Sequence, residues 1–144
     1  MTHKFLEHTA DIKFHIENDT IEESFKESIE VIREIICGED TIKKPNNYGD
    51  IKRITKNIKC EGKDLKRLFY EFIEEIIFIF DSSMILPYNV INLTIKNNNK
   101  YILNSEIEFY HPEKINTGIK SITYHEMMIE KINGKWIIEA VVDI

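Results

Sequence analysis

The sequence has 144 residues, of which 42% are hydrophobic and 31% are charged, and its formal net charge is −6. These proportions suit a single domain over residues 1–144 and exclude a disordered or fibrous chain. An acidic chain with scattered lysines is atypical of a general nucleic-acid binder, so we expect any contact with RNA to be indirect, through a protein partner.

The sequence predicts neither a membrane span nor an export signal. No apolar stretch approaches the ~18 residues that span a bilayer, and the first residues lack the apolar core of a signal peptide. We therefore expect no membrane partner and a cytoplasmic location. Cys37 and Cys60 lie outside any C-x-x-C pair, so neither a zinc site nor a catalytic cysteine is predicted.

A polar cluster lies near the start of the chain, between two strand-like segments. It contains His8, Thr9 and Asp11, and it is followed by alternating apolar and polar residues over 12–16. Asp11 could be an oxygen ligand for a hard cation. Taken alone, the short pattern favours a turn in which Asp11 and Thr9 cap backbone N–H groups.

Two amphipathic helices are predicted, over residues 21–36 and 65–80. In both, apolar residues recur at the spacing of one helix face. Thr20 and Glu23 form a capping box at the start of the first helix, and Asp64 is a suitable N-cap for the second.

The other regular segments are predicted to be strands. One of them alternates Ile91, Leu93 and Ile95 with polar residues. The remaining predicted strands cover residues 54–60, 101–109, 119–131 and 135–144. Strands before, between and after two helices predict an α+β fold, with the two helices packed on a mainly antiparallel sheet.

Asn133-Gly134 predicts a two-residue hairpin between the last two strands. If Ile132 pairs with Lys135, the register places Tyr124 opposite Asp143. Asp143 would then project at the very end of a buried strand.

The end of the sequence is a second candidate site. Asp143 brings one carboxylate and the terminus of Ile144 brings another, and Ca²⁺ and Mg²⁺ prefer such clusters. A frayed terminus is the alternative, which the preceding apolar run disfavours. In the predicted register Thr123 faces Ile144, and Lys120 lies near this end, where a simply solvated lysine is the commoner explanation. His125 faces the apolar side and is predicted to be a buried histidine.

Signatures of catalysis and phosphate binding are missing. The sequence has no G-x-S-x-G, Walker, G-x-G-x-x-G or H-E-x-x-H motif. We therefore expect a protein that is not an enzyme and that acts on another protein.

Several motifs together resemble the archease family over essentially the whole chain. They are FLEHTADI at 5–12, DTIEESF at 19–25, EGKDL at 61–65, FD at 80–81, HP at 111–112, Thr117, KSITY at 120–124 and VDI at 142–144. The chain departs from the family pattern at Gly118, where an acidic residue is usual, at Ile119 and Ser121, and in the loop 38–50.

The resemblance implies an accessory factor for the tRNA-splicing RNA ligase. Such a factor promotes guanylylation and multiple turnover of the ligase's catalytic subunit and broadens its use of nucleotides. The family's metal-binding residues correspond to Asp11, Asp143 and Ile144, and its functional lysine to Lys120. Thr123 and His8 are further candidates for partner activation.

The implied cofactor is a divalent cation, Ca²⁺ in the first place, with Mg²⁺ or Mn²⁺ as alternatives. Two other functions compete with ligase activation. One is a chaperone or modulator of other nucleic-acid-processing proteins. The other is a phosphoester hydrolase, in which a metal held by Asp11 and Asp143 activates water.

Overall fold

The computed structural model describes residues 2–6, 11–38 and 52–144. Its helices are α1 (Ile21–Cys37) and α2 (Leu65–Ser83). Its strands are β1 (Thr2–Leu6), β2 (Asp11–Asn18), β3 (Ile54–Gly62), β4 (Leu86–Asn98), β5 (Lys100–Tyr110), β6 (Ser121–Ile132) and β7 (Lys135–Asp143). The predicted α+β class and both predicted helices are confirmed.

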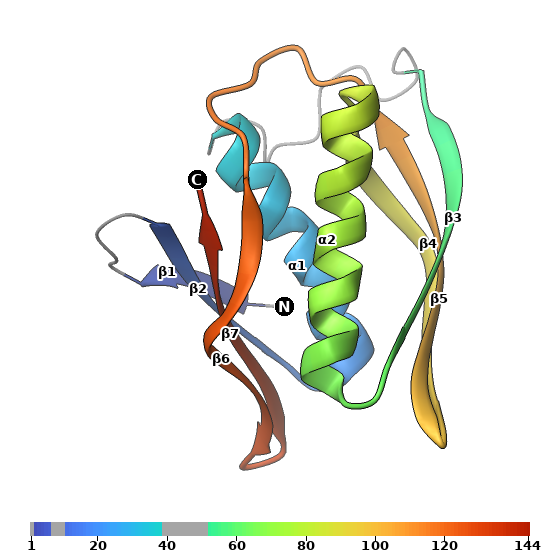
Figure 1. Cartoon of the computed structure of the whole chain (residues 1–144), viewed down its shortest axis with the longest axis vertical. Helices are drawn as coiled ribbons and strands as arrows, with labels where there is room; N and C mark the ends of the chain where they lie inside the picture. The colour runs from blue at the N-terminus through green and yellow to red at the C-terminus, as the bar shows by residue number, and fades with distance from the viewer. Residues whose placement is uncertain (1, 7–10, 39–51) are drawn as a thin grey trace.

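The strands form two antiparallel sheets, in the order β1-β2-β7-β6 and β3-β5-β4. Both helices lie between the sheets (Figure 1): α2 contacts β6 and β3, and α1 contacts β2 and β4. Each helix is therefore buried on two sides, which explains the width of the apolar stripe on α2. Among the described residues, neither helix is long and apolar enough to cross a membrane.

Aromatic side chains fill the space between the sheets. Phe14, Phe25, Phe69 and Phe72 are completely buried. The ring of Phe25 lies 5.2 Å from that of Phe69 and 5.7 Å from that of Phe72, measured between centroids. These contacts join β2, α1 and α2 in one core.

The two predicted N-caps are confirmed. The Thr20 hydroxyl accepts a hydrogen bond from the Glu23 backbone N–H at 3.1 Å. The Asp64 carboxylate accepts one from the Arg67 N–H at 2.8 Å. Each cap satisfies one of the N–H groups that the first helical turn leaves without a partner.

The segment that precedes β6 closes the other end of α1. The Asn116 backbone N–H donates to the Ile36 carbonyl at 2.7 Å, and its side-chain amide donates to the Cys37 carbonyl at 3.2 Å. At the helix end, Gly38 has φ 89°, and a Cβ there would meet the Asn116 side chain at 2.5 Å. This docking fixes the path of the chain into β6.

β6 and β7 form the predicted hairpin. Ile132 pairs with Lys135, and the same register continues to Met128 opposite Glu139. The register predicted from the Asn-Gly turn is therefore confirmed over this part of the hairpin.

Further from the turn the predicted register is wrong, because residues 124–127 leave the ladder as a bulge. Glu126 adopts φ 61° within it. Four residues of β6 lie opposite the single Ala140 of β7, so pairing resumes with Ser121, and not Tyr124, opposite Asp143.

Two further predictions fail for the same reason. Thr123 faces Val141 instead of Ile144, and its hydroxyl accepts a hydrogen bond from the His125 backbone N–H at 3.1 Å. The His125 side chain, predicted to be buried, is exposed.

The predicted alternation of Ile91, Leu93 and Ile95 on β4 is also wrong in part, because the pairing of β4 is irregular. Register shifts lie between Pro87 and Asn89 and between Val90 and Asn92. Ile91 is consequently 48% exposed and does not share the inward face of Leu93.

Candidate functional site

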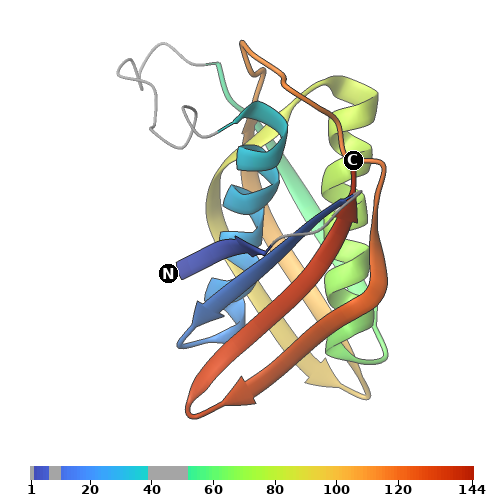
Figure 2. The ribbon, with the colours of Figure 1, turned by 90° about the vertical axis from the view of Figure 1, so that its left-hand side faces the viewer.

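The two predicted metal-binding aspartates meet where β2 begins and β7 ends in the first sheet, an end of the sheet that we call the aspartate edge. Asp11 is the first residue of β2 and Asp143 the last of β7, and the antiparallel register places them directly opposite each other. Directly paired residues project to the same face, with Cβ atoms about 5 Å apart. Both aspartates are partly buried. Figure 2 looks onto this sheet and shows the C-terminus at the edge where β2 begins.

The aspartates project from the face of the sheet that carries no helix. On β7, Ile138, Ala140 and Val142 are fully buried against the helices. Successive strand residues alternate between faces, so Asp143 points away from the helices. Neither α1 nor α2 therefore covers the two carboxylates.

Neighbouring strands hold Asp143 from both sides. On one side it pairs with Asp11, and on the other with Ser121, whose hydroxyl donates to a carboxylate oxygen of Asp143 at 3.4 Å. The Lys120 backbone N–H donates to the Asp143 carbonyl at 2.8 Å. Because both edges of the strand end are bonded, these contacts argue against a frayed terminus.

The other predicted residues take different positions. The Lys120 side chain is exposed, directly before β6, and extending the Ser121–Asp143 register by one residue sets it opposite Ile144. Thr123 is two pairs further from this end of the strand, on the same face as Ser121. Ile144 is 42% exposed. His8 lies outside the described residues.

An ion pair lies across β7 next to the site. Lys13 on β2 and Glu126 on β6 approach to 3.9 Å between Nζ and Oε1, although β7 separates their strands. Val141 lies on the strand between them and is only 1% exposed. The bulge in β6 thus brings Glu126 over the outer face of the sheet.

Sequence reasoning did not identify two residues that organise this edge. Ser121, which the sequence shows only as a departure from the family pattern, is the first. The sequence does not predict its place opposite Asp143, because no glycine marks the bulge that brings it there. Glu74 on α2 is the second, and its carboxylate accepts a hydrogen bond from the Ile122 N–H at 2.9 Å. This bond ties α2 to the start of β6.

Gly118, the departure from the family pattern, lies in the segment that enters β6. A Cβ at this position would meet no atom within 4 Å. The chain therefore has room for a larger side chain there, and steric crowding does not explain the glycine.

The donor atoms at this edge suit a hard cation. Ca²⁺ takes six to eight oxygen ligands, and Asp11 and Asp143 offer two carboxylates on adjacent strands. Among the described residues no group of three or more His, Cys, Asp or Glu side chains is arranged to hold a metal. A cation at these two carboxylates would need further oxygen ligands, such as backbone carbonyls, a chain-terminal carboxylate or water.

Both cysteines, Cys37 and Cys60, are buried and form no disulfide. Burial, reinforced by the negative charges of Glu75 and Glu71, raises the pKa of Cys60 to about 12. The neutral thiol of Cys60 is a poor nucleophile.

Sequence comparison matches the chain along its length. The model of the archease protein family matches residues 3–144. The protein archease of Pyrococcus furiosus is 32% identical over 143 residues, covering 96% of this chain and 95% of the relative. The protein archease of Sulfolobus acidocaldarius is 30% identical over 144 residues, covering 98% and 97%.

Two solved structures share the fold. The solution structure of Methanobacterium thermoautotrophicum protein 1598 superposes with a TM-score of 0.77 at 18% identity, covering 99% of this chain and 98% of the other. The crystal structure of a Thermotoga maritima archease, described as a possible chaperone, gives a TM-score of 0.64 at 20% identity, covering 98% and 96%.

Proposed function

The chain belongs to the archease family, and from this membership we propose that it is an accessory protein that activates the tRNA-splicing RNA ligase. It would promote guanylylation and multiple turnover of the ligase's catalytic subunit and widen the ligase's use of nucleotides. The observation that carries the proposal is the family match over residues 3–144. The pairing of Asp11 with Asp143, which joins the first and last of the family motifs, supports it.

We propose further that Asp11, Asp143 and the terminal carboxylate of Ile144 hold a divalent cation, Ca²⁺, Mg²⁺ or Mn²⁺. When bound, the cation supplies a positive charge that can bridge these carboxylates to phosphate or acidic groups of the partner.

The residues around the cation would have distinct tasks. The β2–β7 ladder sets the separation of the two aspartates, and the Ser121 hydroxyl orients the Asp143 carboxylate. Lys120 adds a second, exposed positive charge at the same edge. In this proposal the chain presents charge and shape to the ligase and forms no covalent intermediate of its own.

The test is a guanylylation assay with purified ligase, GTP and RNA, with and without this protein. Catalytic amounts should speed guanylylation and raise the number of turnovers per ligase, while this chain acquires no label from GTP. Asp11→Asn, which removes one negative charge at nearly constant size, should abolish most of the stimulation. Glu130→Gln is the matched control, because Glu130 is an exposed carboxylate on β6 outside the family motifs.

Labelled guanylate on this chain, or an unchanged number of turnovers, would contradict the proposal. The description of the T. maritima relative as a possible chaperone supports a second candidate, a general chaperone. The same assay separates the two, because a general chaperone does not raise guanylylation of a ligase that is already folded.

A further inference from the structure

A second polar and aromatic surface lies where β3 leads into α2, at the lower end of α2 in Figure 1. Tyr70 on α2 and Tyr124 in the β6 bulge stack with 4.4 Å between ring centroids and 9° between ring planes. Tyr124 is 44% exposed, since the bulge takes it out of the ladder. The pair therefore presents a flat aromatic surface to solvent.

Arg67 fixes this aromatic pair. Its guanidinium carbon lies 5.9 Å from the centroid of Tyr70, and its Nη1 donates to the Tyr124 hydroxyl at 3.5 Å. Its Nη2 also contacts Glu71 at 2.7 Å. The cation is thus held beside the tyrosines.

Arg67 also lines a pocket of about 400 Å³, together with Glu61, Gly62, Lys63 and Lys100. Glu61 is the acid in this lining, and Lys100 contacts it at 2.6 Å, a hydrogen bond that lowers the pKa of Glu61. Lys63 makes no ion pair with any residue of the described ranges, so its charge is available to a ligand.

We propose that this surface, formed by Lys63, Arg67, Lys100, Tyr70 and Tyr124, binds a single-stranded RNA segment. One base would stack on Tyr124, and the adjoining phosphate would lie in the pocket between Lys63 and Arg67. Single-stranded nucleic acids are bound in this way, by aromatic faces that stack bases next to cations that follow the backbone. The inference goes beyond the proposed function, because it requires neither the ligase nor a bound cation.

The net charge of −6 does not oppose such a local site. Exposed charges are screened over about 8 Å at physiological ionic strength, so the groups nearest the ligand decide the outcome. The sequence did not reveal the site because its cations come from the β3–α2 turn, α2 and β5, which only the fold brings together.

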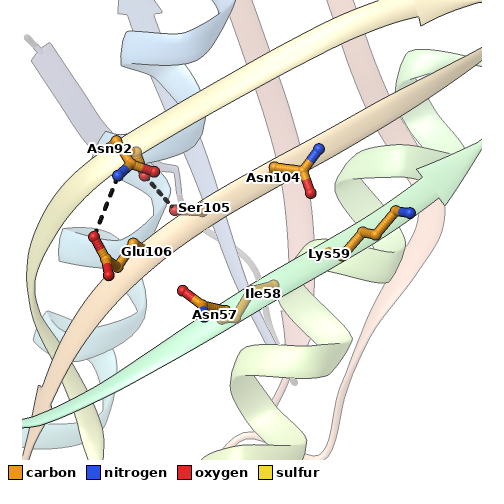
Figure 3. Close-up of a pocket in the computed structure, with 7 residues that line it drawn as sticks. All are labelled: Asn57, Ile58, Lys59, Asn92, Asn104, Ser105 and Glu106. Atoms are coloured by element: carbon orange, nitrogen blue, oxygen red, sulfur yellow. Dashed lines mark hydrogen bonds between the residues drawn. The ribbon is translucent and has the colours of Figure 1, made fainter.

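A second pocket, on the outer face of the β3-β5-β4 sheet, lacks this combination (Figure 3). It has a volume of about 450 Å³ and is lined by Asn57, Ile58, Lys59, Asn92, Asn104, Ser105 and Glu106. The lining holds one cation and one acid and contains no aromatic ring. Asn92 is also engaged, donating to Glu106 at 3.4 Å and accepting from Ser105 at 2.7 Å.

The experiment measures the fluorescence anisotropy of a short labelled oligouridylate titrated with the full chain, without ligase, at several salt concentrations. We expect binding that weakens as salt rises. Tyr124→Leu should weaken it by about tenfold, because a leucine covers Tyr70 but offers no face for stacking. Tyr124→Phe should restore binding, since it keeps the ring.

Charge substitutions give an independent readout. Lys63→Gln should weaken binding and reduce the slope of log K against log salt by about 0.7, the loss of one phosphate contact on a single strand. Lys114→Gln should change neither quantity. Lys114 is an exposed lysine in the segment near the opposite end of α2. Thermal unfolding establishes that each variant is folded.

The proposal is overturned if the oligouridylate does not bind, or if Tyr124→Leu and Lys63→Gln bind it as tightly as the unmodified protein. It is equally overturned if an RNA duplex of the same length, or GMP alone, binds as tightly as the single strand. Stimulation of ligase guanylylation is measured separately, so either proposal can fail while the other stands.

Discussion

Burial holds the side chains of the interior between the two sheets, whereas strand register positions those at the aspartate edge of the first sheet. Interior side chains such as Phe25 and Phe72 are fully buried and join several elements. At the edge, Asp11 and Asp143 are only partly buried, and the register of neighbouring strands determines their positions. Substitutions in the interior should therefore cost stability, whereas those at the edge should cost function and leave the fold in place.

The largest effect is expected in the interior. Phe72→Ala should lower the free energy of unfolding by about 3–5 kcal/mol, because it leaves a cavity beside Phe25 that the surroundings fill only in part. Phe78→Ala on the same helix is the matched control. Phe78 is 64% exposed, so its loss should stay within about 0.5 kcal/mol. Urea unfolding compares the two, and equal losses of stability would contradict the assignment of the large cost to burial of Phe72.

A polar contact at the border of the interior should have an intermediate effect. His3 on β1 contacts Glu27 at 2.5 Å through Nδ1 and Glu34 at 2.9 Å through Nε2, and both glutamates lie on α1. A neutral imidazole donates only one hydrogen bond, so the protonated ring is needed for both. Burial alone would lower the pKa of His3, but the hydrogen bonds to Glu34 and Glu27 outweigh it and raise the pKa.

His3→Gln should therefore destabilise the protein in a pH-dependent way. At low pH the loss should be roughly 1.5–3 kcal/mol, typical of hydrogen bonds to a charged group. Because the pKa is higher in the folded state, this stabilisation is fully present below the unfolded-state value of 6.5. It is lost as the pH rises through the folded-state pKa.

Urea unfolding at pH 6 and pH 9 tests this sign. The difference in free energy of unfolding between the unmodified protein and His3→Gln should be smaller at pH 9 than at pH 6. His111→Gln, at an exposed position, should differ little from the unmodified protein at either pH. A difference that widens with pH would contradict the charged form of His3.

The β6–β7 hairpin shows how far the sequence could predict this edge. Asn133-Gly134 determines pairing close to the turn, because the turn type fixes the register of the residues that flank it. The bulge at 124–127 cannot be read from the sequence, since Glu126 occupies a left-handed conformation that glycine or asparagine more often adopts. The prediction therefore identified Asp143 but placed the wrong residue beside it.

The same distinction between local and long-range signals holds for the fold. The starts of both helices and the caps at Thr20 and Asp64 follow from residues within a few positions of one another, and these predictions were confirmed. The division of the described strands into two sheets depends on pairings such as β2 with β7 and β3 with β5. Alternating hydrophobicity gives the faces of a strand but not its partner, so the second sheet was not predicted.

A smaller effect is expected at the edge itself. Asp11→Ala should reduce stability by about 1 kcal/mol, the size of a lost cap, but should strongly weaken divalent-cation binding and ligase activation. Urea unfolding and calorimetric titration of Ca²⁺ measure the two effects on the same variant. Outright unfolding of Asp11→Ala would instead favour a structural, turn-capping role for this carboxylate.

The smallest effect on stability, with a large effect on function, is expected from a tag fused after Ile144. The fusion converts the terminal carboxylate to a neutral amide and moves the free carboxylate onto a flexible tail. The β7 pairs and the buried Ile138, Ala140 and Val142 remain, so stability without metal should barely change. Ca²⁺ or Mg²⁺ affinity by calorimetry and the guanylylation rate should both fall, whereas an N-terminal tag of equal length should leave both unchanged.

Equal affinities and rates in the two tagged proteins would remove the terminal carboxylate from the proposed ligand set. Asp11 and Asp143 would then have to hold the cation with backbone carbonyls and water.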